Sequence, residues 1–187
     1  LGGDCSHGNQ KTIAITAIGT FRPLRIHRSR ALPGDHLIVT GPHGLSRLGL
    51  GLLRNEPLLE KEIINTKLQQ IAIKAHTKPE PSLGIIKALK QTKPMNTPWR
   101  AAGADSSDGL LTAIQGLCNS SKCSAIIKKD CLPKAKHWPE GKHWEEWCIN
   151  GGEDFEIIIS LPPKWATKLK SVRSPTWTKP HKMNPIT

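Results

Sequence analysis

Aromatic and acidic residues are both scarce in this chain of 187 residues, and each shortage narrows what the chain can do. Tyrosine is absent and phenylalanine occurs twice, so there is no aromatic-rich strip on which nucleic-acid bases could stack. The 15 acidic residues are outnumbered by 27 lysines and arginines, which gives a formal net charge of +12. This charge favours anionic partners, either nucleic acids or small phosphorylated substrates. Because the basic residues are dispersed, with only short doublets such as Lys128-Lys129, we do not expect nucleic acid to be the partner.

Long apolar runs and paired cysteines are also missing. No run approaches the roughly 20 apolar residues that a membrane helix needs, and the mean hydropathy is −0.37. The five cysteines are an odd number without close paired spacing, which favours neither a disulfide framework nor a zinc site. We therefore expect reduced thiols, no membrane partner and a cytoplasmic location.

The start of the sequence is unusual for a natural N-terminus. The chain begins Leu1-Gly2-Gly3-Asp4, with neither a methionine nor a basic signal region. We therefore expect a piece of a longer protein, with enough residues for one domain or for one domain and part of another.

The few acidic residues include three clusters beside glycine: Gly-Gly-Asp at 2–4, Asp-Ser-Ser-Asp-Gly at 105–109 and Gly-Gly-Glu-Asp at 151–154. Glycine allows tight turns and a close approach to a ligand, and carboxylate oxygens together with substrate phosphates are typical ligands of Mg²⁺. Asp105 and Asp108 are three residues apart at the start of a predicted helix, so both can reach one metal cluster. Helix capping would explain the same segment, and the segment alone leaves both explanations open.

Alternating strand and helix patterns predict a mixed α/β fold. Strands are expected at 11–21, 36–40, 124–128 and 155–161. Helices are expected at 45–54, 60–75, 82–90, 109–118 and 163–170, with Ser82 as a cap. An apolar stripe is expected to bury one side of the 60–75 helix: Ile64, Leu68, Ile71, Ala72 and Ala75.

Other residues have ordinary explanations. The eight histidines, among them His43, show no metal-ligand spacing and are assigned to surface or loop positions. Trp144 and Trp147 are assigned to packing.

The motifs occur in a recognisable order. Gly-Gly-Asp at 2–4 is followed by Arg28, Pro-Gly-Asp at 33–35, Val-Thr-Gly at 39–41, Pro-x-Pro at 79–81, Asp-x-Ser-Asp-Gly-Leu at 105–110 and Gly-Gly-Glu-Asp-Phe-Glu at 151–156. This order resembles the thiamine-monophosphate kinase family, in the superfamily of aminoimidazole ribonucleotide synthetase, selenophosphate synthetase and the hydrogenase-maturation dehydratase. The resemblance runs from Leu1 to about Met183, and the last two motifs are specific to the thiamine-phosphate branch.

The resemblance implies a fold and an activity. Residues 1–30 would be the C-terminal remnant of an N-terminal ATP-binding sheet domain, and 31–187 an incomplete C-terminal α/β domain of the aminoimidazole ribonucleotide synthetase-like type. The activity would be Mg²⁺-assisted phosphorylation of thiamine monophosphate by ATP, in a protein that is a homodimer at full length. The acceptor is itself an anionic phosphate, so the transfer depends on positioning and electrostatics rather than on a catalytic base.

The resemblance also assigns residues to these roles. Asp4, Asp105 and Asp108 match metal-binding aspartates, and Asp4 also lines the nucleotide site. The other implied nucleotide contacts are Gly3, Arg28 and Ser107, and the implied substrate contact is Glu153.

The sequence departs from the family in several places. A Gly-Asp-Asp-Ala metal motif and a substrate-contacting histidine region are expected before Leu1, and a substrate-stacking aromatic residue is expected beyond Thr187. We therefore expect the 187 residues alone to have no measurable kinase activity. Two alternatives stay open: another ATP-using synthetase of the superfamily, and a degenerate relative that binds nucleotide or nucleic acid without catalysis.

Overall fold

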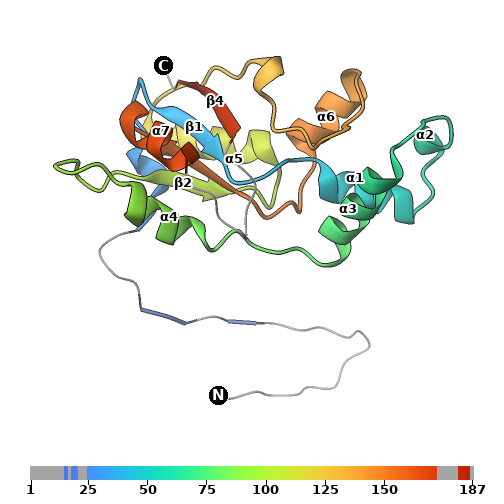
Figure 1. Ribbon diagram of the computed structural model, residues 1–187, viewed down its shortest axis with the longest axis horizontal. Helices are drawn as coiled ribbons and strands as arrows, with labels where there is room; N and C mark the ends of the chain where they lie inside the picture. Colours follow the sequence, from blue (N-terminus) through green and yellow to red (C-terminus); the bar gives the residue numbers. More distant parts are fainter. Residues whose placement is uncertain (1–14, 17, 21–24, 172–180, 186–187) are drawn as a thin grey trace.

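The computed structural model describes residues 15, 16, 18–20, 25–171 and 181–185 of the chain. In chain order the elements are the 3-10 turn η1 (Arg28–Arg30), β1 (His36–Val39), α1 (Leu45–Leu53), α2 (Pro57–Glu60), α3 (Thr66–Thr77), α4 (Ile85–Thr92), β2 (Ala102–Asp105), α5 (Leu110–Ser121), the 3-10 turn η2 (Lys129–Cys131), α6 (Lys142–Asn150), β3 (Ile157–Leu161), α7 (Pro163–Ser171) and β4 (His181–Pro185). The strands form an antiparallel sheet in the order β2-β3-β1-β4 (Figure 1). This mixture of helices and strands confirms the expected α/β class.

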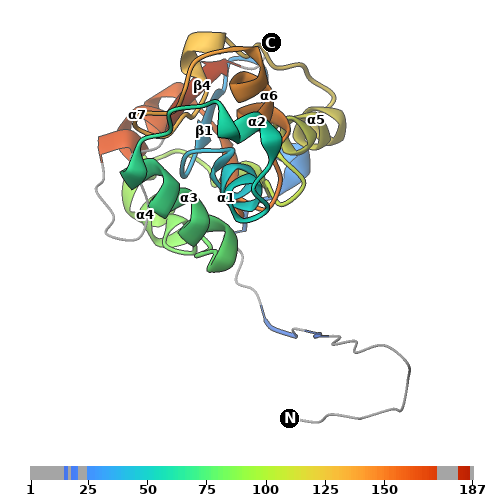
Figure 2. The same cartoon turned by 90° about the vertical axis from the view of Figure 1, so that its right-hand side faces the viewer.

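Helices cover both faces of the sheet and so bury β1 and β3 on both sides. In β1, Leu37 and Val39 belong to a core formed with α1, α3, α5 and α6, whereas Ile38 belongs to a second core formed with α4 and α7. Alternate residues of a strand point to opposite faces, which accounts for this division. Figure 1 shows α1, α2 and α3 gathered at one end of the molecule, away from α4 and α7, and Figure 2 looks onto that end. None of the helices in the described residues is long and apolar enough to cross a membrane.

The strongest sequence patterns are confirmed. The expected strands at 36–40 and 155–161 are β1 and β3, and the expected helices at 45–54, 109–118 and 163–170 are α1, α5 and α7. The strands β1 and β3 are mostly apolar and are buried almost throughout. The packing role of the tryptophans is confirmed as well, since Trp144 is 1% exposed and its ring contacts Trp138 and Trp147 edge-on.

The helix expected at 60–75 is wrong at its beginning. Residues 61–65 are not helical, because the side chain of Asn65 accepts hydrogen bonds from the backbone N–H groups of Lys67 and Leu68 and so starts α3 one residue later. Leu68 and Ala72 are buried as expected, but Ile71 is 45% exposed and lies off the core face.

Three further expectations fail or are incomplete. Residues 124–128 form no strand; Ala125 alone makes an isolated bridge. Ser82 does not cap α4, which starts after Gly84. The Ser82 hydroxyl instead donates to the Glu156 carboxylate at 2.9 Å. The strands β2 and β4 and the helices α2 and α6 were not expected, and most of the strand expected at 11–21 lies outside the described residues.

A buried ion pair ties the start of β1 to the segment before β2. Asp35, which is 2% exposed, accepts two hydrogen bonds from the Arg100 guanidinium, at 2.6 and 2.7 Å. The same carboxylate accepts from the backbone N–H of Leu32 at 3.0 Å and from the Ser160 hydroxyl at 2.7 Å. The buried charge therefore has a cation and several hydrogen bonds, which is the condition for a stable buried carboxylate.

Arg100→Ala should lower the free energy of unfolding by about 3–5 kcal/mol, because it leaves the Asp35 carboxylate buried without its cation. Urea denaturation monitored by tryptophan fluorescence measures this loss. Arg54→Ala, at an exposed arginine just after α1, is the matched control and should change stability by less than about 0.5 kcal/mol. A loss for Arg100→Ala as small as that of the control would contradict this account of Asp35.

Candidate functional site

The site is built on the short loop that joins β2 to α5. The strand ends at Asp105 and the helix starts at Leu110, so the Ser-Ser-Asp-Gly segment between them turns sharply. Gly109 has φ of +99°, and a Cβ there would stand 3.0 Å from the carbonyl oxygen of Asn150. Only glycine combines this backbone conformation with so close an approach to the end of α6.

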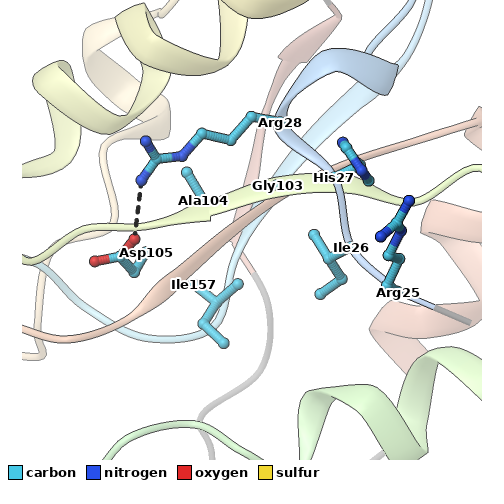
Figure 3. Close-up of a pocket in the computed structure, with 8 residues that line it drawn as sticks. All are labelled: Arg25, Ile26, His27, Arg28, Gly103, Ala104, Asp105 and Ile157. Carbon is cyan, nitrogen blue, oxygen red and sulfur yellow. Dashed lines mark hydrogen bonds and ion pairs between the residues drawn. The ribbon is translucent and has the colours of Figure 1, made fainter. Parts of the chain in front are cut away.

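Asp105 is held in its charged form at the start of this loop. The Ser107 hydroxyl donates to one carboxylate oxygen at 2.7 Å, and an Arg28 guanidinium nitrogen lies 3.2 Å from the other (Figure 3). The hydrogen bond from Ser107 is the largest influence and lowers the pKa of Asp105. Burial opposes it, and a backbone hydrogen bond together with the hydrogen bond and charge of Arg28 lowers the pKa further. Asp105 therefore offers an ionised carboxylate at neutral pH.

Four of the expected site residues share one cavity. A hollow of about 150 Å³ is lined by Arg28, Asp105, Ser107 and Asp108, together with Thr112, Ala113 and Gly116 of α5. A larger cleft of about 670 Å³ adjoins it through Arg28 and Asp105 and extends along residues 25–28 and 103–105 as far as Ile157 (Figure 3). Gly3 and Asp4, the remaining nucleotide and metal candidates, lie outside the described residues.

Glu153 lines a different pocket. Its backbone N–H donates to the Ser107 carbonyl at 2.7 Å, so the two loops are joined. The φ of Glu153 is +64°, and its carboxylate, 63% exposed, lies 3.6 Å from a ring nitrogen of His76. A pocket of about 220 Å³ is lined there by Ser46, Arg47, Leu50, Gly152 and Glu153. The structure thus separates the expected substrate contact from the four residues around Asp105.

Asp154 has a structural contact that the sequence did not reveal. Its two carboxylate oxygens accept hydrogen bonds from the backbone N–H groups of Gly44 and Ser46, at 2.7 and 2.9 Å, and so cap the start of α1. Burial raises the pKa of Asp154 to about 6, against the opposing effect of these hydrogen bonds. A carboxylate used in this way does not face a cation, in contrast to the role expected for its cluster.

Glu156 also has a structural role. It accepts hydrogen bonds from the hydroxyls of Thr40 and Ser82. Burial raises its pKa, while these two hydrogen bonds act in the opposite direction. A Cβ on Gly41 would collide with the Glu156 carboxylate, so glycine at this position makes the contact possible. Asp154 and Glu156, at the end of the Gly-Gly-Glu-Asp-Phe-Glu motif, therefore hold the glycine-containing loop that joins β1 to α1.

His43 is the clearest site-related residue that sequence reasoning misplaced. It lies in a loop, as expected, but it is 0% exposed, and one ring nitrogen lies 2.9 Å from the hydroxyl of Ser106. A polar residue between two glycines of a strand-to-helix loop was the available signal, and it indicates a loop without indicating burial.

The chemistry of the residues around Asp105 fits a hydrated divalent cation bound to phosphate. No group of three His, Cys, Asp or Glu side chains within the described ranges is placed to hold a metal by itself. Mg²⁺, however, is usually bound by one or two protein carboxylates, with waters and substrate phosphates as its other ligands. Asp105 and Asp108 supply two carboxylates, and Arg28 supplies a cation for a phosphate beside them.

Comparison with known sequences identifies relatives along most of the chain. No family model matches it. The chain is 55% identical over 166 residues to the thiamine-monophosphate kinase of Prochlorococcus marinus, covering 89% of this chain and 50% of that protein. It is 41% identical over 170 residues to the Synechococcus elongatus enzyme of the same name, covering 90% and 50%. The chain therefore spans about half the length of the curated relatives it matches.

Solved structures similar to this chain include proteins of the same name. The thiamine-monophosphate kinase of Stenotrophomonas maltophilia has a TM-score of 0.71 at 21% identity, with 89% of this chain and 52% of that chain covered. AaThiL, solved in complex with AMPPCP and TMP, has a TM-score of 0.63 at 25% identity, covering 86% and 47%. The hydrogenase maturation protein HypE of E. coli shares the fold, with a TM-score of 0.57 at 15% identity over 87% and 46%. These likenesses confirm the expected fold type.

The raised pKa of Asp154 predicts a pH effect on stability. Between about pH 4 and pH 6 the folded chain binds more protons at Asp154 than the unfolded chain, whose aspartate titrates near 3.8, so the contribution of this group to stability falls as pH rises. The stability of the wild type relative to Asp154→Asn should therefore decrease by up to about 3 kcal/mol from pH 4 to pH 7.

Urea denaturation across this pH range measures the difference. Asp130→Asn, at an exposed aspartate of η2, is the control and should follow the wild type at every pH. A constant difference between wild type and Asp154→Asn would show that burial does not raise this pKa.

Proposed function

We propose, for a chain that belongs to the thiamine-monophosphate kinase family, that the protein transfers the γ-phosphate of ATP to thiamine monophosphate and yields thiamine diphosphate. The observation that carries this proposal is the gathering of Arg28, Asp105, Ser107 and Asp108 around one cavity in a chain 55% identical to an enzyme of that name. The complex of AaThiL with AMPPCP and TMP supports an ATP site and a substrate site in the same protein.

The principal barrier to this reaction is repulsion between two anions. The acceptor phosphate and the triphosphate are both negatively charged, so catalysis consists of bringing them together and in line. Bound Mg²⁺ would supply positive charge that offsets this repulsion. In this proposal Asp105 and Asp108 hold that cation with Asp4, Arg28 and Ser107 contact the nucleotide phosphates, and Gly3 and Asp4 line the nucleotide site.

The proposal includes the organisation of the complete protein. Residues 1–30 would end an ATP-binding sheet domain, and residues 31–187 would belong to a C-terminal α/β domain. A homodimer in the cytoplasm is the proposed state of the enzyme. The free cysteines among the described residues, two of them buried, are compatible with a reducing compartment.

Asp105→Asn and Asp108→Asn test the metal role in the complete natural protein. Each should lower kcat/KM by about 10²–10³-fold, because a charged ligand that acts on the transition state is removed while the side-chain shape is kept. Coupled assay of thiamine diphosphate formation at varied Mg²⁺ measures this. Asp130→Asn is the matched control and should retain wild-type kcat/KM and Mg²⁺ dependence. If both site variants keep the wild-type Mg²⁺ dependence, neither aspartate holds the metal.

Glu153→Gln tests the separate substrate pocket. Loss of one charge-assisted hydrogen bond should raise KM for thiamine monophosphate by about tenfold or more and leave KM for ATP unchanged. Steady-state kinetics with each substrate varied in turn measures the two constants. Glu146→Gln, at an exposed residue of α6, is the control and should change neither. A larger rise in KM for ATP than for thiamine monophosphate would place Glu153 at the nucleotide instead.

A further inference from the structure

His43 and Ser106 form a buried polar contact directly behind the loop that carries Asp105 and Asp108. Both residues are 0% exposed, although Asp105 and Asp108 on either side of Ser106 are exposed to solvent. His43 Nε2 lies 2.9 Å from Ser106 Oγ, and His43 Nδ1 lies 3.2 Å from the carbonyl oxygen of Gly41. The loop is therefore attached to the protein interior through Ser106.

The imidazole is fixed from both sides. With Nδ1–H donating to the Gly41 carbonyl, Nε2 is the acceptor, and the single proton of the Ser106 hydroxyl is shared between Nε2 and the Glu156 carbonyl oxygen, which lies 3.1 Å from Oγ. The backbone N–H of His43 donates to the Pro133 carbonyl at 2.8 Å, so the main chain of this residue is held as well. A hydrogen bond to a ring held in this way fixes both the position and the orientation of the Ser106 hydroxyl.

Ser106 passes this constraint to its neighbours. Its backbone N–H donates to the Glu156 carbonyl at 2.9 Å, and its own carbonyl accepts from the N–H of Gly109 at 3.0 Å. A rotation of the backbone at Ser106 would therefore move Asp105 and Asp108 together. An apolar pair at positions 43 and 106 would fill the same space without fixing a direction, whereas buried polar groups avoid a desolvation penalty only when each has a hydrogen-bond partner.

We propose that His43 is a positioning residue, which acts through Ser106 to hold the carboxylates of Asp105 and Asp108 in the geometry that binds Mg²⁺ with the nucleotide. The role in Mg²⁺ binding rests on the proposed kinase function. His43 itself contacts neither substrate nor metal in this proposal.

The experiment uses the complete natural protein and five variants. His43→Leu and Ser106→Ala each remove one partner, the double variant removes both, and His43→Gln keeps an amide oxygen that can accept from Ser106. Ser160→Ala is the matched control, because Ser160 is another buried serine on β3 whose hydroxyl donates to a carboxylate, at 2.7 Å, away from the loop. Two readouts are compared: amide hydrogen exchange at Ser106 and Gly109, and calorimetric binding of AMPPCP at varied Mg²⁺.

Positioning by His43 predicts a specific pattern. His43→Leu and Ser106→Ala should each speed exchange at the two amides and raise the Mg²⁺ concentration needed for nucleotide binding by about tenfold, the equivalent of one buried hydrogen bond. The double variant should be no worse than the worse single variant, since the two residues act as one unit. His43→Gln should recover at least half of the loss on a logarithmic scale, and Ser160→Ala should change neither readout.

Other results would overturn the proposal. Unchanged exchange in His43→Leu, or faster exchange with an unchanged Mg²⁺ requirement, would reduce His43 to an ordinary buried residue. An equal effect of Ser160→Ala would assign the change to general loss of stability. If the wild type binds Mg²⁺ and AMPPCP but transfers no phosphate to thiamine monophosphate, the proposed kinase function fails. The role of His43 in binding is then still tested by the exchange and binding measurements on the variants. Absence of any such binding in the wild type would overturn both.

Discussion

The antiparallel pairing of β2 with β3 is the constraint on which the arrangement of the site depends. Asp105 is opposite Ile157 at the end of this pairing, and the ladder continues beyond the strands. Ser106 N–H bonds to the Glu156 carbonyl, and Glu153 N–H bonds to the Ser107 carbonyl. Two motifs more than 40 residues apart in the sequence are thereby fixed side by side through their backbones. Their glycines are necessary for this contact, since a Cβ on Gly152 would lie 2.8 Å from the carbonyl oxygen of Ser107.

Solvent exposure divides the acidic residues that share this region into two kinds. Asp105 is exposed and hydrogen-bonded in its charged form, so its pKa is lowered and it can attract a cation at neutral pH. Asp154 and Glu156 are covered by the loops after β1, so burial raises their pKa and they serve as acceptors for protein groups. A short sequence such as Gly-Gly-Glu-Asp-Phe-Glu therefore contains residues with separate tasks. Glu153 is the acidic residue of this hexapeptide whose side chain is exposed and which lines a pocket.

Sequence reasoning succeeded where a pattern is local and failed where structure depends on distant partners. The strands β1 and β3 were predicted because a short, mostly apolar run suits a strand buried on both faces. The strand β2 was missed because Ala-Gly-Ala-Asp has no β-branched residue, and the segment becomes a strand through its pairing with β3. Helix α6 was missed because only Trp144 and Cys148 are buried in a polar segment, too few to form a recognisable stripe. For the candidate site, the family resemblance implied that Arg28, Asp105, Ser107 and Asp108 belong together, but no periodicity could place His43 beside their loop.

The ion pair between Arg28 and Asp105 has the properties of a contact that can be exchanged. Its side chains are 61% and 55% exposed, and exposed pairs of this kind contribute only about 0–1 kcal/mol to stability. The pair between Arg100 and Asp35, by contrast, has a carboxylate that is 2% exposed and cannot be given up without a large loss. In the proposed reaction, a cation taking the place of Arg28 at Asp105 would release the guanidinium to a phosphate at little cost. A weak pair at the site and a strong pair at the start of β1 would suit the two purposes, since in the proposed reaction the first would change partners and the second would not.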